Sequence, residues 1–178
     1  KTEHILEYRS VIDGILEWFG NRIGSHGLIE DLGFWPFVDW VDGWERGVPA
    51  AVEKGPATVH SLLYAAGLQA AARLNELTDR KAMAAEYEKR SREILQQVEN
   101  RCWSDTHGLF KEGPGIPEFS QHTQIWAVLT GLVKGKRAKS MMKKSLALED
   151  IYVCSYSMRF YLFRALEMTN LYDRSEGI

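Results

Sequence analysis

Apolar residues recur at intervals of three and four positions along most of the chain, the spacing that places them on one face of an α-helix. The first such stripe follows Thr2, a residue type that favours helix N-caps, and Gly24 stands where a left-handed residue would end the helix. Its apolar members are Ile5, Tyr8, Ile12, Ile15, Leu16, Phe19 and Ile23. The pattern predicts a first helix with one buried stripe.

Two further stripes, over residues 59–77 and 83–102, are separated only by Thr78-Asp79-Arg80. So short a connection predicts two antiparallel helices that form a hairpin. Ser120 stands where it would cap a fourth helix that carries Ile125, Val128, Leu129, Leu132 and Val133.

A short fifth helix is predicted over residues 138–146, and a sixth from about Ser155 to Leu171. The sixth is apolar nearly all round, which predicts that it is covered on more than one side. No strand-like alternation of convincing length occurs. We therefore expect one all-α segment over residues 1–178, built from helical hairpins.

Composition narrows the function classes. The 178 residues are 45% hydrophobic and 26% charged, a balance typical of a packed globule. The formal net charge of −2 argues against a nucleic-acid partner, and no apolar run is long enough to predict a membrane span. Cys102 and Cys154 either pair or, as we expect, remain two separate buried thiols.

The connection from Ser25 to Pro56 is long and rich in Trp and acidic residues. Its centre reads Phe34-Trp35-Pro36-Phe37-Val38-Asp39-Trp40-Val41-Asp42-Gly43-Trp44-Glu45. Indole faces stack on the apolar faces of sugars and carboxylates accept hydrogen bonds from hydroxyls, so this combination favours a carbohydrate site. The alternative is that Trp35 and Trp40 fill the core at a helix start and that Asp39 caps this helix.

A second long connection runs from Trp103 to Phe119, and such loops often carry function. Glu118, Gln121 and His122 lie near the start of the next helix, a position that favours polar groups, and we expect them at the rim of the pocket. His122 is alternatively an interior histidine whose hydrogen bonds are satisfied within the fold.

Metal and cofactor motifs are not found. The five histidines show no His-x-x-x-His spacing and the two cysteines no Cys-x-x-Cys spacing, so we expect no metal site. Gly113-Pro114-Gly115 lacks the Lys-Ser/Thr ending of a phosphate loop, and no cofactor is expected. The basic run from Lys134 to Lys144 is interpreted as the solvated face of a helix.

Three segments, in this order, resemble the bacterial α-L-rhamnosidases of glycoside hydrolase family 78. They are Trp35-Pro36-Phe37-Val38-Asp39-Trp40, the stretch from Phe119-Ser120-Gln121-His122 to Leu132, and Tyr156-Ser157-Met158-Arg159 with the helix that follows. The resemblance covers essentially the whole chain. It implies an (α/α)6 toroid, of which about half is present, and hydrolysis of terminal α-L-rhamnosides with inversion in the full-length enzyme.

The chain departs from that family at both catalytic positions. The family's general acid lies upstream in an Asp/Arg/Glu-rich motif, and its general base downstream near a Thr-Thr-x-x-Glu element, and neither motif occurs here. The resemblance therefore implies the middle-to-late part of the catalytic domain, with no catalytic residue inside this chain. Trp35, Asp39 and Trp40 would orient the sugar, with Glu118, Gln121 and His122 at the rim. Asp42 and Glu45 are the carboxylates that would substitute for a missing one.

Two functions from different classes follow. The first is a fragment of a rhamnosidase-like hydrolase whose partners are a rhamnose-containing glycoside and the remainder of the catalytic domain. The second is a non-catalytic helical module that binds carbohydrate or protein, with a self-dimer covering the open edges of the toroid. No compartment is predicted: a signal peptide on the full-length protein would imply the periplasm or secretion, and its absence the cytoplasm.

Overall fold

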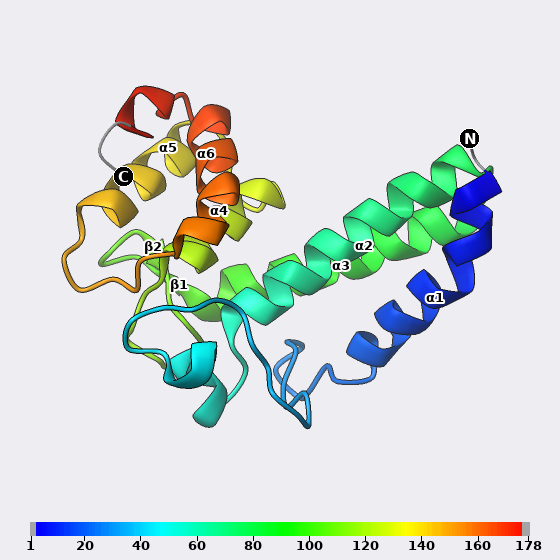
Figure 1. Cartoon of the computed structure of the whole chain (residues 1–178), viewed down its shortest axis with the longest axis horizontal. Helices are drawn as coiled ribbons and strands as arrows, with labels where there is room; N and C mark the ends of the chain where they lie inside the picture. Colours follow the sequence, from blue (N-terminus) through cyan, green and yellow to red (C-terminus); the bar gives the residue numbers. More distant parts are fainter. Residues whose placement is uncertain (1–2, 176–178) are drawn as a thin grey trace.

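The computed structural model describes residues 3–175, and the side chains of residues 6–173. The described part is all-α, as predicted from the hydrophobic spacing (Figure 1). Its α-helices are α1 (Glu3–Gly20), α2 (Thr58–Leu77), α3 (Lys81–Cys102), α4 (Gln121–Leu129), α5 (Gly135–Ala147) and α6 (Arg159–Met168). Four short 3-10 segments add η1 (Glu45–Gly47), η2 (Ala50–Glu53), η3 (Tyr156–Met158) and η4 (Tyr172–Ser175).

Helices α2 and α3 form the predicted antiparallel hairpin (Figure 1). The turn closes because Asp79 adopts a left-handed conformation with φ of 57°, and the backbone N–H of Arg80 donates to the carbonyl of Asn75 at 2.8 Å. Leu62, Leu68 and Val98 lie on the facing sides of the pair and are fully buried. The hairpin runs roughly along the longest axis of the molecule (Figure 1).

Helix α4 is the most enclosed helix of the fold and packs against α2, α5 and α6. Ser120 caps it as predicted, since its Oγ accepts a hydrogen bond from the backbone N–H of Thr123 at 3.2 Å. Polar side chains in the first turn of α4 are as buried as the apolar ones behind them. Such burial requires partners inside the protein, and these partners form the candidate site.

The end of α1 differs from the prediction. The helix stops at Gly20, and Gly24 is not left-handed; the chain instead turns at Gly27, whose φ is 69°, so that Ile23 pairs with Ile29 in an antiparallel bridge. The predicted cap Thr2 and the side chain of Ile5 lie outside the described residues.

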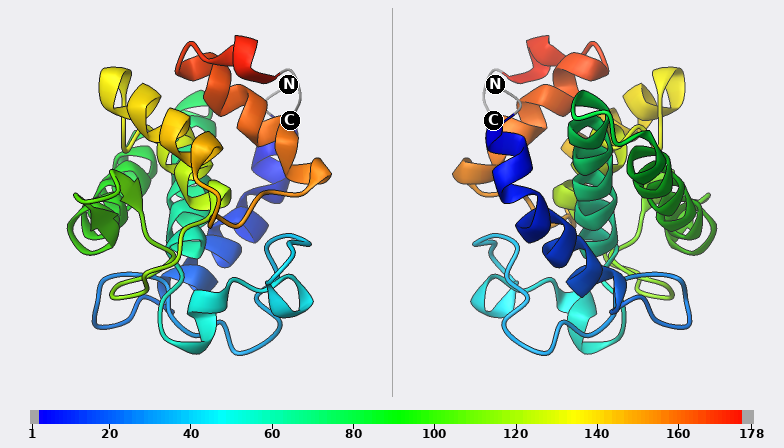
Figure 2. Two further views of the ribbon diagram at one scale, coloured as in Figure 1. Left: turned by 90° about the vertical axis from the view of Figure 1, so that its left-hand side faces the viewer. Right: turned by 90° about the vertical axis from the view of Figure 1, so that its right-hand side faces the viewer.

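Helix α1 buries only part of its apolar stripe. It runs along the outside of α2 (Figure 2), and Tyr8 and Ile15 are 58% and 52% exposed. A groove of about 690 Å³ follows this face and ends at Phe34, which is 64% exposed. A patch of this kind marks a surface that other chain segments or molecules cover.

Helix α6 is shorter and less covered than predicted. It begins at Arg159, and Phe160 is 60% exposed. The guanidinium of Arg164 lies 6.0 Å from the centre of the Phe160 ring, so a cation and solvent cover the ring in place of a second layer of helices. The prediction failed because aromatic residues near arginines are compatible with a surface position.

The connections between helices are ordered. Residues 21–57 lie beside the hairpin. Leu28, Ile29 and Leu32 belong to the main core, and the rest of the segment contributes to a small second core of Val38, Trp44, Ala51, Ala57, Val59 and Ile116. Between α3 and α4, two short strands pair antiparallel, β1 (Trp103–Ser104) with β2 (Leu109–Phe110), which the sequence pattern did not predict.

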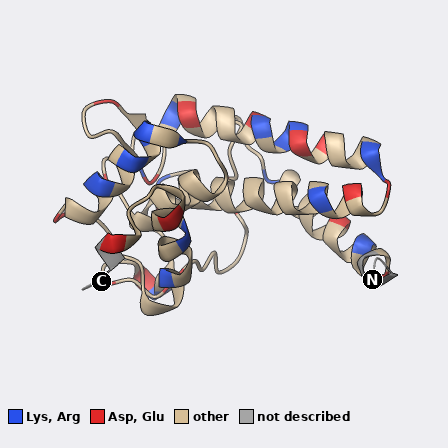
Figure 3. Cartoon of the chain, turned by 90° about the horizontal axis from the view of Figure 1, so that it is seen from above, with Lys and Arg blue, Asp and Glu red and all other residues tan. Residues whose placement is uncertain are grey.

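Charge and cysteine positions agree with the sequence analysis. Both cysteines are free and buried. Charged residues follow the outer faces of the helices (Figure 3), and the lysines of α5 lie on its solvated side while Ala138, Met141 and Met142 face the core. None of the described helices has the length and hydropathy needed to cross a bilayer.

Candidate functional site

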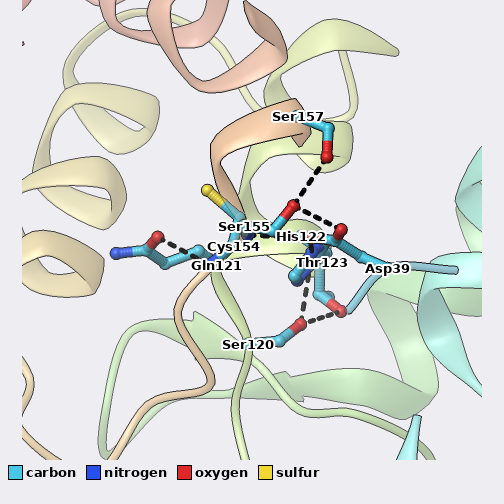
Figure 4. A network of polar contacts seen from close by, with 8 residues as sticks. All are labelled: Asp39, Ser120, Gln121, His122, Thr123, Cys154, Ser155 and Ser157. Carbon is cyan, nitrogen blue, oxygen red and sulfur yellow. Dashed lines mark hydrogen bonds and ion pairs between the residues drawn. The ribbon is translucent and has the colours of Figure 1, made fainter. Parts of the chain in front are cut away.

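Asp39, from the first long connection, is buried against the start of α4 and the segment before α6 (Figure 4). Nε2 of His122 lies 2.7 Å from Oδ2 of Asp39, and the backbone N–H of Ser155 donates to the same oxygen at 2.8 Å. The hydroxyl of Ser155 donates to Oδ1 at 2.5 Å. One carboxylate therefore joins three segments that are distant in the sequence.

The protonation states in this network are defined by its surroundings. Burial acts to raise the pKa of Asp39, but hydrogen bonds from Ser155 and His122 outweigh it and lower the pKa below the usual value. Burial also lowers the pKa of His122, and this outweighs the attraction of Asp39. At neutral pH an ionised carboxylate thus accepts a hydrogen bond from a neutral imidazole.

The order of these groups excludes a nucleophilic triad. In such a triad the imidazole lies between the hydroxyl and the carboxylate and takes the proton from the hydroxyl. Here Asp39 lies between Ser155 and His122, so the hydroxyl donates directly to the carboxylate. Trp44 covers the other side of His122, with ring centres 4.8 Å apart, and Nδ1 of His122 is buried without a partner. The network is suited to holding segments together.

Gln121 lies beside this network and fixes the same segment. Its Oε1 accepts a hydrogen bond from the backbone N–H of Cys154 at 3.1 Å, directly before Ser155. Since Gln121 is 5% exposed, its side chain is committed to this internal contact. Asp39 and Gln121 hold consecutive residues of the loop that leads to α6.

Next to the buried Asp39, three aromatic side chains are exposed as one cluster. The ring of Phe37 lies 5.2 Å from that of Trp35 and 5.2 Å from that of Trp40, and the two indoles are 6.1 Å apart. Trp35 is 49% and Trp40 63% exposed. These residues, called the aromatic cluster below, do not fill the core, so the alternative of core-filling Trp residues does not describe them; Trp44 is the indole that fills this role.

Backbone contacts hold the aromatic cluster in place. The indole Nε1–H of Trp35 donates to the carbonyl of Arg46 at 2.9 Å, and Arg46 adopts a left-handed conformation with φ of 53°. The backbone N–H groups of Val38 and Asp39 both donate to the carbonyl of Gly47. A left-handed residue other than glycine stores strain of about 1–3 kcal/mol, and such strain is often found at functional sites.

A cavity of about 550 Å³ opens beside the aromatic cluster. It is lined by Trp35 and Pro36 on one side and by charged residues of the η1 and η2 segments on the other, Glu45, Arg46 and Glu53. We call it the Trp35 cavity. Its volume lies within the range of about 300–1,000 Å³ typical of small-molecule sites. An aromatic wall that faces hydrogen-bonding groups suits a sugar ring.

The two remaining acidic residues near α4 have different surroundings. Glu118 lies at the surface, where its Oε1 is 3.1 Å from Nζ of Lys54. Glu112 is sealed in the interior at 1% exposure; burial raises its pKa to about 7, and Thr123 donates to its Oε1 at 3.0 Å. A pKa near 7 is typical of a general acid, but Glu112 lines neither the Trp35 cavity nor the groove along α1.

The structure thus divides the sequence-derived candidates. It brings Asp39 and His122 into direct contact, places Trp35 and Trp40 in the aromatic cluster, and sets Gln121 and Glu118 apart from that cluster. Their roles toward a substrate remain predictions. Ser155, Arg46 and Glu112 were not singled out from the sequence, because an isolated Ser, Arg or Glu carries no spacing signal.

Metal-ligating side chains do not converge in the described part of the chain. No group of three or more His, Cys, Asp or Glu side chains there has the arrangement to hold an ion.

Comparisons with known proteins agree on a glycosidase-like fold. Residues 35–115 match the family model of the mannosylglycerate hydrolase MGH1-like glycoside hydrolase domain. This range contains the aromatic cluster, the Trp35 cavity and the α2–α3 hairpin. No curated protein sequence matches the chain significantly.

Two solved structures share the fold of nearly the whole chain. A rhamnosidase of glycoside hydrolase family 78 from Bacillus sp. GL1 matches with a TM-score of 0.82 and 17% identity, over 96% of this chain and 18% of that chain. A rhamnosidase from Klebsiella oxytoca with rhamnose bound matches with a TM-score of 0.75 and 18% identity, over 98% of this chain and 31% of that chain. The chain therefore has the fold of part of the rhamnosidase α/α toroid and spans less than a third of the length of either structure.

Proposed function

We propose that this chain forms the sugar-contacting part of a glycoside hydrolase that acts on terminal α-L-rhamnosides. The observation that carries the proposal is the exposed aromatic cluster at the edge of the Trp35 cavity, held in place by the buried Asp39. The match to a glycoside hydrolase domain and the rhamnosidase fold support the class of reaction.

Within this proposal the candidates take different roles. Trp35 and Trp40 stack on the apolar face of the sugar ring. Asp39 acts indirectly. Its carboxylate is buried, and to contact a sugar hydroxyl it would have to give up its hydrogen bond with Ser155 or with His122. His122 and Gln121 fix the loops beneath, and Glu118 lies at the rim with Lys54.

Hydrolysis with inversion needs a general acid and a general base about 6.5–9.5 Å apart on opposite sides of the bond. Glu45 and Glu53 line the cavity, but both are exposed to solvent and neither is buried in the apolar surroundings that a general acid needs. We assign both catalytic carboxylates to the remainder of the catalytic domain, which also supplies helices to cover the open face of α1.

The test combines turnover and binding by the isolated 178-residue chain. We expect no hydrolysis of p-nitrophenyl α-L-rhamnoside, together with weak binding of L-rhamnose that is lost in Trp40→Ala. Robust turnover that disappears in Asp39→Ala would place the chemistry inside this chain and overturn our assignment. Rhamnose binding that is unchanged in Trp40→Ala would refute the stacking role.

A second candidate is favoured by one observation, the exposed apolar face of α1 with its groove of about 690 Å³. In this alternative the chain is a non-catalytic helical module that pairs with a protein or with a second copy of itself. Sedimentation measurements separate the two candidates. Dimerisation that is abolished by Val11→Glu, without any rhamnose binding, would support the module.

A further inference from the structure

A second cavity shares one lining residue, Pro36, with the Trp35 cavity. Its volume is about 310 Å³. Leu32, Pro36 and Val52 provide apolar walls. The polar lining comes from Ser25, His26, Glu30, Asp31 and His60. We call it the His60 cavity.

His60 is the buried polar group of this cavity, at 7% exposure. Its Nε2 lies 3.2 Å from the carbonyl oxygen of Pro36, and because a carbonyl only accepts, Nε2 carries the proton. Burial lowers the pKa of His60 to about 4, so the ring is neutral at pH 7 and Nδ1 is an acceptor. Nδ1 has no hydrogen-bond partner among the described residues, and it is not sealed from solvent.

The other polar groups of the cavity are also mainly acceptors. The carboxylate of Glu30 lies 3.1 Å from Nδ1 of His26, and Oδ1 of Asp31 accepts the backbone N–H of Gly33 at 2.7 Å. Each carboxylate keeps further acceptor capacity after these contacts. Acceptors beside apolar walls fit a ligand that brings hydroxyl donors and C–H faces, as a sugar or polyol does.

We propose that the His60 cavity is a second subsite, which binds the sugar or polyol unit joined to the sugar in the Trp35 cavity. The inference rests on the proposed function, because the shared wall at Pro36 places the two cavities side by side for the two halves of one glycoside. Nδ1 of His60 and the carboxylate of Glu30 then accept hydrogen bonds from hydroxyls of the second unit.

The experiment follows two NMR signals of the 178-residue chain, the indole Nε1–H of Trp35 and the Cε1–H of His60. The probes are L-rhamnose and the disaccharide α-L-rhamnosyl-(1→6)-D-glucose. We expect rhamnose to shift the Trp35 signal only, and the disaccharide to shift both and bind about tenfold more tightly, a difference of about 1.4 kcal/mol.

Variants separate the two cavities. Glu30→Ala and His60→Ala should reduce the affinity for the disaccharide about tenfold, to that of rhamnose, and leave rhamnose binding unchanged. Glu30→Ala is the safer variant, because the side chain of Glu30 lies near the surface. His60 is buried, so His60→Ala is more prone to destabilise the fold. Glu86→Ala, an exposed carboxylate of α3 outside both cavities, is the matched control and should change neither affinity.

The outcomes distinguish this inference from the proposed function. The second subsite would be overturned, and the first left in place, if the disaccharide shifts the Trp35 signal but not the His60 signal. The same holds if Glu30→Ala binds the disaccharide as tightly as the unchanged chain does. Shifts at neither residue would refute both. A His60 shift with ethylammonium and none with the disaccharide would identify the cavity as a cation site and overturn the proposal.

Discussion

Nε2 of His122 lies 2.7 Å from Oδ2 of Asp39, although 83 positions separate the two residues in the sequence. Both side chains are almost completely removed from water, at 1% and 3% exposure. A buried ion that loses its partners is costly, so this pair ties the first long connection to α4. These contacts hold the backbone next to Trp40, which is 63% exposed.

Asp39→Ala should destabilise the chain by about 2–4 kcal/mol, because it leaves the donors of His122 and Ser155 without their acceptor, and each buried unsatisfied group costs about 1–3 kcal/mol. Because the hydrogen bonds to Asp39 lower its folded pKa, its contribution is present above the unfolded pKa near 4 and is lost as the pH falls through the lower folded pKa. Urea unfolding at pH 7 measures the effect. Asp42→Ala, at an exposed position, is the control and should stay within about 0.5 kcal/mol of the unchanged chain.

Glu112→Gln should remove a pH dependence of stability. Burial raises the folded pKa of Glu112 to about 7, above the unfolded value near 4.5. Stability of the unchanged chain therefore falls as the pH rises from about 4.5 to 7, by roughly 3 kcal/mol at 1.36 kcal/mol per unit.

Glutamine keeps an acceptor for the hydroxyl of Thr123 but cannot ionise, so the variant should lack this decline. Unfolding free energies at pH 5 and pH 8 provide the comparison. An equal decline in the variant and the unchanged chain would show that another group is responsible.

Trp40→Ala should weaken binding without changing stability, whereas Trp44→Ala should lower stability. Trp40 is 63% exposed, so its removal should leave the free energy of unfolding within about 0.5 kcal/mol and weaken rhamnose binding about tenfold. Trp44 is 5% exposed and packs on His122, so its removal should destabilise the fold by about 3–5 kcal/mol. Chemical denaturation and calorimetric titration test both residues, and similar effects of the two variants would contradict the assignment.

Gly14→Ala should stabilise the isolated chain by about 0.5–1 kcal/mol, because alanine favours a helix and an added Cβ meets no atom within 4 Å. Gly47→Ala is the contrasting variant: φ of 73° and a Cβ only 2.5 Å from the Phe37 ring make it strained and crowded. We expect a loss of stability and a displaced aromatic cluster. Thermal unfolding orders the two variants, and the reverse order would refute the explanation.

The spacing of apolar residues along the chain was sufficient to predict much of the fold. The α2–α3 hairpin and the Ser120 cap depend on residues that are neighbours in the sequence, so the pattern contains their structure. The ends of α1 and α6 were misjudged for a different reason. Gly27 rather than Gly24 makes the turn because Ile23 pairs with Ile29, a contact that no helical pattern encodes.

The candidate site was predictable only in part. The concentration of Trp and Asp around Asp39 is visible in the sequence, but the contact to Ser155 spans 116 positions and gives no local signal. The burial of Glu112 and the left-handed Arg46 likewise depend on tertiary structure. Residue types indicated a sugar site, whereas the division into exposed stacking residues and buried supporting residues required the structure.

Pro36 has a consequence for how binding can be regulated. This residue lines both the Trp35 cavity and the His60 cavity, and its carbonyl accepts the hydrogen bond from His60. A ligand that displaces Pro36 from one side changes the affinity of the other side, and thermodynamic linkage requires the same factor in the opposite direction. Occupancy of the two neighbouring cavities would then be linked through this one residue.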